Sequence, residues 1–537
     1  MANTESNAQP SRPQHNQVGG RYSWYVLSVL MLVYVFNFID RQILSILNED
    51  IKADLGVTDA QMGFLYGTAF AVFYAVFGIP LGRLADIWTR KSMIALGLFF
   101  WSLMTVLSGT AKGFVSLAAY RIGVGIGESS ASPAAYSMLG DYFPTRMRAT
   151  AVAIYSSGIY LGVGIGMLIG GQIVDRWNAL YPLGTDPPWG LVGWQVAFIA
   201  VGTPGLLMAL WVATLKEPSR GQSEGLAPPK PHAAPFREFA RELMAVLPPF
   251  TLFSLYTNGG PRAALNNLLL ASTIALVAWG LAVAIGSPVQ WIALGVGCYA
   301  FFSWVQGLGI RDQVAFKTIY QCPTLIFGMV GFAWCAFVGY GGAYWGPPYF
   351  IRVHGESASS VGTIIGITAM TAGWLGVTLG GIFSDWLKAR TPLGRTHCGI
   401  ITAVLSAPFG FIVFTTPDLQ TAYVANFFFT LFSSLWIGPA IAFTNELVVP
   451  RLRATASATY ILVVTMIGLA LGPFTIGQIS TTLSTGGMES GEALRIAGLC
   501  GGIGYLFAII FMLFAARGVE ATEASRVDRA RRAGEII

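Results

Sequence analysis

Four ionisable side chains interrupt two long apolar segments of the chain. Asp40 and Arg41 lie in the segment that begins at Trp24, and Arg121 and Glu128 lie seven residues apart in a later one. That spacing puts Arg121 and Glu128 two turns apart on one helical face. A charge inside a bilayer costs about 2.5 kcal/mol or more, so such groups usually face a wet cavity and compensate one another. The signs predict two pairs, Asp40 with Arg121 and Arg41 with Glu128.

Buried charges of this kind favour a transport function, with a purely structural ion cluster as the alternative. A carboxyl group that has left water can exchange a proton during a transport cycle. Glu128 is therefore the expected proton-coupling group. Its protonation would free Arg41 to meet an anionic substrate, while Asp40 and Arg121 complete the predicted site.

The composition indicates a membrane protein. Of 537 residues, 54% are hydrophobic and 11% are charged, whereas a soluble domain carries about 25% charged residues. The pI is near 9.0, but the basic residues sit in short loops and the tail, which argues against a nucleic-acid partner. The first twenty residues are polar and the apolar run after them is long enough to span, so no cleavable signal is expected.

Motifs for enzyme chemistry are not found in the sequence. Five cysteines without paired spacing predict no disulfide and no metal site. A Gly-x-Ser-x-Gly match at 221–225 falls in a Pro-rich stretch rather than in a strand-turn-helix setting. The four histidines lie outside the centres of the apolar runs, and no nucleotide-binding Gly-Lys loop is present. We therefore expect no enzyme activity and no cofactor.

The apolar runs have the length of membrane helices, which need about 20 residues each. They lie near 24–46, 60–82, 92–110, 114–140, 149–172 and 194–215, and again near 322–346, 358–384, 398–416, 421–446, 454–482 and 494–516. Two uncharged runs between these sets, 263–286 and 289–310, meet at the turn signal Gly286-Ser287-Pro288. The sequence predicts an all-α polytopic membrane protein with two six-helix bundles and an inserted two-helix hairpin, about 14 transmembrane helices.

An internal repeat relates the two sets of spans. The segment from Arg146 to Tyr155 recurs from Arg451 to Tyr460, an offset of 305 residues, and each copy follows an acidic residue, Asp141 or Glu446. Duplicated halves in a membrane chain are typical of transporters with a site between the halves. The same offset maps Arg121 onto Asn426 and Glu128 onto Ser433, so the shared architecture does not require these charges.

The distribution of Lys and Arg orients this arrangement. The predicted inner loops and the tail carry most of them, which by the positive-inside rule places both termini in the cytoplasm of an inner-membrane protein. The predicted divisions are a cytoplasmic tail (1–23), a six-helix bundle (24–215), a cytoplasmic linker (216–262), the hairpin (263–310), a second bundle (311–516) and a basic cytoplasmic tail (517–537).

The inner loops also carry acidic residues beside the basic ones in both halves. An Asp at the end of a helix, such as Asp86, can pair with Arg146 or Arg148, and Gly82 can permit close helix approach. Such a pair can hold the inner side shut and open when it breaks, with simple orientation by basic loops as the alternative. The predicted gate comprises Gly82, Asp86, Arg90, Lys91, Asp141, Arg146, Arg148, Asp385, Arg390, Glu446, Arg451 and Arg453.

The loop Gly82-Arg83-Leu84-Ala85-Asp86, followed by Arg90-Lys91, resembles the loop motif of the major facilitator superfamily. The segments 37–41 and 121–129, with Phe143-Pro144-Thr145-Arg146, look like the spinster branch of that family. Animal spinster proteins export sphingosine-1-phosphate or lysophospholipids. The resemblance implies an amphiphilic, anionic, lipid-like substrate, and it adds Asn37 to the predicted substrate and proton-coupling residues.

Glycines and aromatic residues complete the predictions. Gly158, Gly162, Gly166 and Gly170 recur every four residues, a stripe that lets a neighbouring helix approach closely. Trp345, Trp374 and Trp436 are candidates for an apolar cavity wall opposite the charges. Expected partners are membrane lipids, an amphiphilic anionic small molecule and protons, with no obligate protein partner. The alternatives are a proton-coupled small organic-anion symporter, a multidrug exporter and a non-transporting membrane sensor.

Overall fold

The computed structural model describes residues 18–182, 185–225 and 232–535, and these residues form helices and loops. Thirteen helices within them are long and apolar enough to cross a membrane. The first half contains α1 (Arg21–Ile46), α2 (Asn48–Leu55), α3 (Asp59–Tyr66), α4 (Thr68–Ile87), α5 (Arg90–Ser108), α6 (Phe114–Glu128), α7 (Ala131–Tyr142), α8 (Thr145–Leu180) and α9 (Gly193–Ala213).

The predicted span over 114–140 is formed by two helices, α6 and α7, rather than one. They are separated at Ser129 and Ser130, whose hydroxyls donate to the carbonyls of Ile126 and Gly127 at 2.7 and 2.8 Å. Serine side chains that bond back to the preceding turn compete with the helical pattern and favour a bend. The helix break lies directly after Glu128.

The second half repeats this arrangement. It contains α13 (Gln313–Tyr320), α14 (Pro323–His354), α15 (Ala358–Thr368), α16 (Trp374–Lys388), α17 (Gly394–Thr415), α18 (Leu419–Ser433), α19 (Ile437–Glu446), α20 (Arg453–Val463), α21 (Gly472–Thr485), α22 (Ser490–Gly501), α23 (Gly504–Ala516), α24 (Val519–Ala524) and α25 (Arg526–Ala533). Two π-helical turns join neighbouring helices, η4 (Ala369–Gly373) between α15 and α16 and η6 (Val464–Leu471) between α20 and α21.

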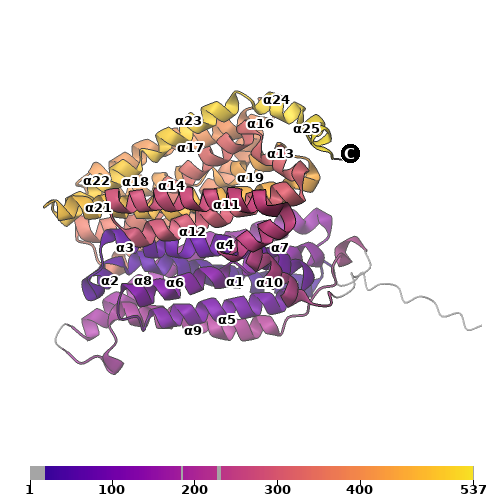
Figure 1. Ribbon diagram of the computed structural model, residues 1–537. Helices are drawn as coiled ribbons and strands as arrows, with labels where there is room; N and C mark the ends of the chain where they lie inside the picture. Colours follow the sequence, from indigo (N-terminus) through magenta and orange to yellow (C-terminus); the bar gives the residue numbers. More distant parts are fainter. Residues whose placement is uncertain (1–17, 183–184, 226–231, 536–537) are drawn as a thin grey trace, which may run out of the picture.

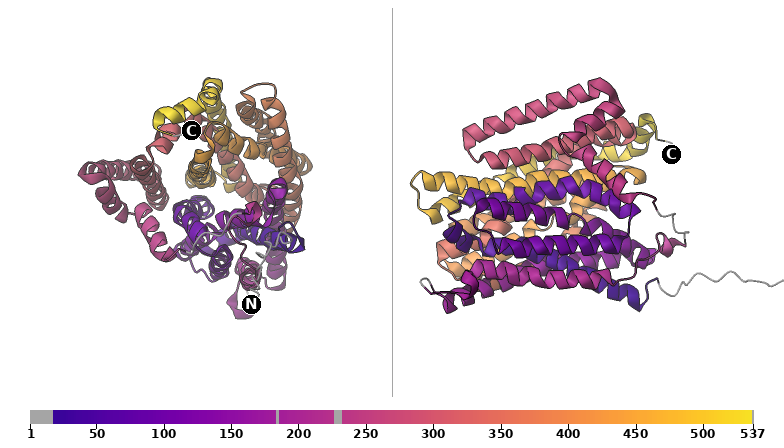
Figure 2. Two further views of the ribbon diagram at one scale, coloured as in Figure 1. Left: turned by 90° about the vertical axis from the view of Figure 1, so that its right-hand side faces the viewer. Right: turned by 60° about the horizontal axis from the view of Figure 1, so that its bottom comes forward.

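The predicted hairpin is present as α11 (Phe250–Ile285) and α12 (Pro288–Arg311), preceded by the amphipathic helix α10 (Pro235–Val246). Helix α11 starts at Phe250, whereas the sequence predicts a linker up to 262. Gly260, with φ of 74°, and Pro261 interrupt α11 without ending it, because proline fits the first turn of a helix that resumes after it. Figure 2 shows the hairpin on the outside of the two bundles.

The helices run nearly side by side between two faces of the molecule. The chain from α9 to α10 and the C-terminal helices α24 and α25 lie at one end, on the right in Figure 1. We call this end the linker face and the opposite end, which carries α2 and α3, the far face. The first half forms one layer and the second half another, with the hairpin along one flank.

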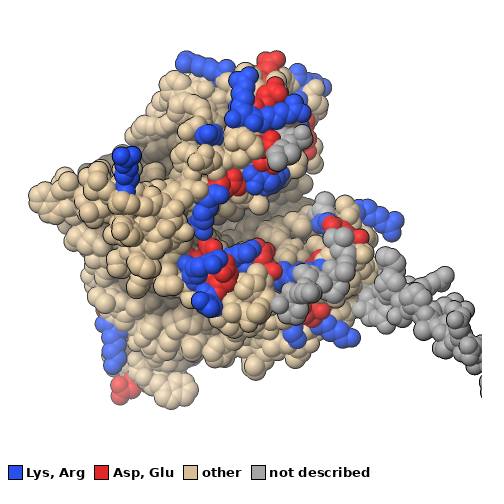
Figure 3. All heavy atoms as spheres, turned by 45° about the vertical axis from the view of Figure 1, so that its right-hand side comes forward, with Lys and Arg blue, Asp and Glu red and all other residues tan. Residues whose placement is uncertain are grey.

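The two halves join between the middle of the molecule and the far face. Gln42 donates to the Ala343 carbonyl at 3.1 Å, Ser45 to the Tyr344 carbonyl at 2.6 Å, and Thr68 to the Ala470 carbonyl at 3.1 Å. On the linker face, the ion pairs of the described residues stay within one half or between a half and its own adjoining segments. Charged side chains line both sides of a hollow between the halves there (Figure 3). We call this hollow the cleft.

Glycines allow the halves to approach closely on the far side. A Cβ on Gly171 would lie 2.2 Å from the Ala358 carbonyl oxygen, and one on Gly362 would lie 2.4 Å from that of Met167. These glycines join α8 to α15 across the halves. The predicted stripe at Gly158, Gly162, Gly166 and Gly170 instead faces α1 within the first half, which confirms its packing role.

Candidate functional site

Helices α1 and α6 bring Arg41 and Glu128 together in the predicted pair. The Arg41 Nη2 donates to the Glu128 Oε2 at 2.7 Å, and the Asn37 side chain lies beside the same carboxylate. The Glu128 side chain has no exposed surface, while 11% of the Arg41 side chain is exposed. The pair is therefore a buried, charge-assisted hydrogen bond whose cation has a small accessible edge.

The predicted pair of Asp40 with Arg121 is not formed through the Asp40 carboxylate. Arg121 Nη1 instead donates to the Asp40 backbone carbonyl at 3.1 Å. The Asp40 side chain points toward α5, where Trp101 and Thr105 lie beside it, and neither carboxylate oxygen has a well-aligned hydrogen-bond partner among the described residues. Adjacent residues on a helix point about 100° apart, so Asp40 and Arg41 contact different neighbours, although Asp40 still interacts electrostatically with Arg121 and Glu128.

Aromatic rings surround the Arg41 guanidinium. Its Cζ lies 4.2 Å from the ring centre of Phe70, 4.8 Å from Phe38 and 5.6 Å from Tyr74. Tyr340 of the second half also interacts with it electrostatically. Ring faces carry negative potential and stabilise a cation. The sequence analysis did not predict these aromatic neighbours of Arg41, although the spacing of four between Phe70 and Tyr74 places them on one helical face.

The charge cluster lies at the closed end of the cleft. Gln42 and Ser45, one turn further along α1, already hydrogen-bond to the second half. Beyond them, Asn48 donates to the Tyr344 hydroxyl at 2.7 Å. Arg41 is thus the last charged residue of α1 before the layer in which the halves touch.

The three tryptophans proposed for a cavity wall have different positions. Trp345 is fully buried, and its Nε1 donates to the Pro473 carbonyl at 2.8 Å, so it belongs to the far-side contact layer and does not line the cleft. Trp436 is 7% exposed at the break between α18 and α19. Trp374 is 49% exposed at the start of α16, directly after η4.

On the linker face, Arg90 ties the first half to the start of the linker. Its side chain is fully buried, pairs with Asp141, and donates Nε to Glu217 at 2.8 Å and Nη2 to the Pro218 carbonyl at 2.8 Å. The neighbouring Lys91 donates to the Ala213 carbonyl at 3.2 Å. The ion pair of Glu217 with Arg90 was not predicted, because Glu217 follows the last apolar run of the first half and resembles any other polar residue of the linker.

The second half has the equivalent pair. Arg395, at the 305-residue offset from Arg90, donates to Glu446 at 2.8 Å and also pairs with Asp385. Arg451 pairs with Asp312 at 3.0 Å and with Glu535 at 2.8 Å. Arg395 therefore takes part in the linker-face ion pairs of the second half, although it was not among the predicted gate residues.

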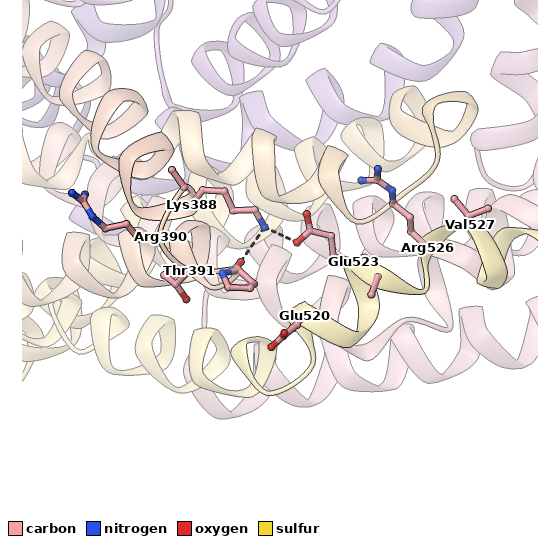
Figure 4. Close-up of a pocket in the computed structure, with 10 residues that line it drawn as sticks. Lys388, Arg390, Thr391, Glu520, Glu523, Arg526 and Val527 are labelled. Atoms are coloured by element: carbon pink, nitrogen blue, oxygen red, sulfur yellow. Dashed lines mark hydrogen bonds and ion pairs between the residues drawn. The ribbon is translucent and has the colours of Figure 1, made fainter.

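The C-terminal helices α24 and α25 pack over the ion pairs of Arg395 and Arg451. Lys388 donates to Glu523 of α24 and to the Pro392 carbonyl at 3.0 Å (Figure 4). Arg526 and Arg529 donate to the carbonyls of Glu446 and Leu447. Lys388, Glu523 and Arg526 line a surface pocket of about 650 Å³. Arg390, which lines it, stacks on Trp386 with its Cζ 3.6 Å from the ring centre. Of these two predicted gate residues, Asp385 pairs with Arg395 rather than with Arg390.

Other predicted gate residues are apart in this structure. Arg148 donates to Ser223 and Glu224 at 2.7 and 2.8 Å rather than to Asp86, and Arg146 and Arg453 are exposed. A Cβ on Gly82 would meet nothing within 4 Å. The expected close approach at Gly82 and the pairing at Asp86 are absent among the described residues, because Arg148 is held by the linker and the charges near Asp86 are those of Arg83, Arg90 and Arg220.

A second ion cluster, not predicted from sequence, joins the halves at the far face. Arg352 of α14 donates Nη2 to Glu49 at 2.7 Å and Nη1 to Asp59 at 2.8 Å. Lys52 also pairs with Asp59, and the Ser480 hydroxyl donates to it at 2.6 Å. The side chains of Arg352 and Asp59 are 8% and 4% exposed. This network connects the two halves through buried charge.

The model of the Major Facilitator Superfamily matches residues 30–473. The chain belongs to this superfamily. It is 25% identical to an MFS-type efflux pump of Mycolicibacterium smegmatis, covering 93% of this chain and 94% of the pump. It is 24% identical to protein spinster of Drosophila melanogaster over 86% of this chain and spans 63% of the fly protein. A region covering 37% of the chain is 32% identical to a probable galactarate/D-glucarate transporter of Bacillus subtilis, covering 41% of that protein.

The solved structures include a bacterial homologue of the human lysosomal transporter spinster in an inward-facing, unoccupied conformation. It matches with a TM-score of 0.65 and 27% identity, covering 95% of this chain and 98% of that one. The chain is therefore a multi-pass, spinster-like transporter of the superfamily. The comparison agrees with the repeat, the all-helical fold and the motifs read from sequence.

Proposed function

We propose that this protein carries an amphiphilic anionic substrate, such as a lysophospholipid, by alternating access. The observation that carries the proposal is Arg41, a partly accessible cation at the closed end of the cleft, surrounded by Phe38, Phe70 and Tyr74. A guanidinium suits a phosphate headgroup, and the rings suit an apolar chain. The linker face, with its excess of basic loops, is the cytoplasmic side.

Proton coupling follows from competition for Arg41. When Glu128 is ionised, its carboxylate holds the guanidinium at 2.7 Å. When Glu128 takes up a proton, the charge-assisted bond is lost and Arg41 becomes available to an anionic headgroup. Substrate and proton therefore favour each other's binding, as reciprocal linkage requires.

Opening to the opposite side requires the far-face network of Arg352, Glu49 and Asp59 to break. Ion pairs must then close the linker face, where Asp86 and Arg146 have no ion-pair partner among the described residues. The cycle thus exchanges one set of charge contacts for another.

The test is transport of a radiolabelled lysophospholipid into proteoliposomes, with and without a proton gradient. Glu128→Gln keeps the shape of the side chain and removes its titration, and Glu492→Gln, a surface carboxylate paired with Arg495, is the matched control. We expect gradient-driven flux in the wild type and the control, and loss of the gradient effect in Glu128→Gln. Flux that ignores the gradient in the wild type would reject the proton coupling.

A proton-coupled symporter for small organic anions is the second candidate, favoured by the similarity to the galactarate/D-glucarate transporter. The same vesicles distinguish it through competition. A lysophospholipid carrier is inhibited more strongly as the chain of a competitor lengthens, whereas a sugar-acid symporter is inhibited by glucarate and is insensitive to chain length. Binding of either compound without flux would instead indicate a sensor.

A further inference from the structure

The inserted hairpin lies over one of the two lateral seams between the halves. One seam runs between α8 and the α15–η4–α16 segment, and the other between α4 and the α20–η6 segment. Each seam contains a π-helical turn from the second half. In both, the halves touch on the far side and part toward the linker face. Helix α8 packs on α15 and η4 but has no comparable packing against α16, and α4 packs on η6 but has no comparable packing against α20.

At the α4 seam, α12 and α10 fill the space that the parting halves leave. Val76 of α4, Leu462 of α20, Ala300 of α12 and Val246 of α10 belong to one buried apolar cluster. Gly297 of α12 lies over the seam itself, since a Cβ there would meet Val72 of the first half and Met466 of the second, each at 3.1 Å.

The hairpin is held there by polar contacts as well as by packing. Ser287 donates to Gln478 at 2.7 Å, and Trp291 packs edge-on against Phe474. Asn267 of α11 is fully buried between the two hairpin helices, where it donates to Ser303 at 2.8 Å and accepts from Tyr299 at 2.7 Å. Such hydrogen bonds between membrane helices fix their pairing. The outer helix α11 therefore presents its apolar surface to lipid and moves with α12.

The α8 seam has no such cover among the described residues. Trp374 and Leu379 of α16 are 49% and 47% exposed on the linker-face side of η4, and Ala153 of α8 is exposed as well. Since α8 has no comparable packing against α16, an acyl chain, which needs no polar partners, can lie between these two helices.

We propose that the hairpin and α10 form a fixed cover over the α4 seam, so that a lipid-like substrate enters the cleft from the bilayer between α8 and α16. The route rests on the proposed lipid-like substrate, but the cover does not. With one seam covered, the acyl chain trails into lipid on one side while its headgroup reaches Arg41 through the cleft.

The experiment maps lipid contacts by photo-crosslinking and mass spectrometry. A diacyl phosphatidylglycerol with a diazirine in its acyl chain reports surfaces that face the bilayer, and a lysophosphatidylglycerol with the same diazirine reports the substrate route. In the wild type we expect both probes to label α8 and α16 and neither probe to label Val76 or Leu462. Diacyl label at Val76 or Leu462 in the wild type would overturn the cover without any variant.

A matched pair of glycine variants tests whether the packing of α12 on the α4 seam is what excludes lipid. Gly297→Leu collides with Val72 and Met466 and should lift α12, so that label appears on α4 and α20. Gly280→Leu, on α11 where a Cβ meets nothing within 4 Å, should leave the wild-type pattern. An unchanged pattern in folded Gly297→Leu would also overturn the cover.

The two probes separate the proposals. Lysolipid label at the α4 seam as strong as at α8 and α16 would overturn the route. Absence of lysolipid transport and label, with the diacyl probe still excluded from the α4 seam, would reject the lipid-like substrate and the route while supporting the cover.

Discussion

The two halves share an ion pair on the linker face but differ in their buried middle. Arg90 with Asp141 and Arg395 with Glu446 stand at the same 305-residue offset and form the same contact. In the middle of the first half, Arg121 and Glu128 are buried and charged, whereas their counterparts Asn426 and Ser433 are neutral.

This difference separates architecture from function. A peripheral pair found in both halves belongs to the shared fold, because each half uses it to connect the same helices. Buried charges found in one half are not needed to build a six-helix bundle, and each costs free energy in a membrane. Their retention in the first half fits a role in binding or coupling, with the second half supplying Tyr340 and the opposing surface.

The largest effect should come from removing one partner of the buried pair. Arg41→Ala leaves the Glu128 carboxylate buried without its cation, which typically costs about 3–5 kcal/mol. We expect a strongly lowered melting temperature in detergent and loss of transport. Asn426→Ala, at the position equivalent to Arg121 in the second half, should cost less than about 1 kcal/mol, because the Asn426 Nδ2 has no hydrogen-bond partner among the described residues. Similar losses for the two variants would show that the buried middle of the first half is not special.

The far-face network should give the next largest effect, because it joins the halves rather than stabilising one of them. Arg352→Ala removes the cation that Glu49 and Asp59 share and leaves Asp59 with Lys52 alone, a change worth about 2–5 kcal/mol for a buried pair. We expect the population to shift away from the state with the far face closed. Labelling of a cysteine at Ser480, which is fully buried, by a water-soluble maleimide measures the shift.

Arg495→Ala is the control for Arg352→Ala, since Arg495 pairs with Glu492 one turn away on an exposed helix face. It should leave the labelling rate unchanged, because exposed pairs contribute about 0–1 kcal/mol. Equal labelling of the cysteine in the wild type and in Arg352→Ala would contradict a role of this network in closing the far face.

The equivalent arginines on the linker face should contribute different amounts to the free energy of unfolding. Arg90 is fully buried and bonds to Asp141, Glu217 and Pro218, whereas the Arg395 side chain is 12% exposed and its partner Asp385 is 73% exposed. Arg90→Ala should cost about 3–5 kcal/mol and Arg395→Ala about 1–3 kcal/mol. Chemical denaturation of both variants checks the order. The reverse order would mean that the linker contact through Glu217 adds no stability.

The sequence was sufficient for the fold because hydropathy marks each span and the repeat relates the halves. It also predicted Arg41 with Glu128, since sign and burial leave few partners for a charge in a membrane. Hydropathy could not locate the breaks in regular helix. The separation of α6 from α7 depends on two serines inside an apolar run, and the early start of α11 depends on a Gly-Pro step that resembles the end of a linker.

Charge contacts outside the apolar runs were the part that could not be predicted from the sequence. Glu49, Asp59 and Arg352 come from distant segments, and each looks like an ordinary loop charge at the end of a span. Asp40 and Arg121 interact electrostatically but do not form the predicted ion pair, because the direction of the Asp40 side chain depends on how α1 packs against α5. Trp345 was placed on a cavity wall because nothing local shows that α21 covers it.

The smallest expected effect concerns Asp50 in α2, at a position where the same offset gives Gly355 in the second half. Burial raises the pKa of the Asp50 carboxyl, while Asn178 donates to it at 2.9 Å. A raised pKa in the folded state means that the protonated form is favoured there, so the stability contribution of Asp50 is present below about pH 3.9, its unfolded pKa, and is lost as the pH rises through the folded pKa.

Asp50→Asn keeps an acceptor for Asn178 and cannot ionise, so it should remove this pH dependence. We expect the variant to gain melting temperature over the wild type at pH 7 and to lose most of that gain near pH 4. Asp186→Asn, at an exposed position, should match the wild type at both pH values. A gain for Asp50→Asn that is equal at pH 4 and pH 7 would mean that burial of the carboxylate charge is not the cause. The difference between Asp50 in the first half and Gly355 in the second would then be one of packing rather than of charge.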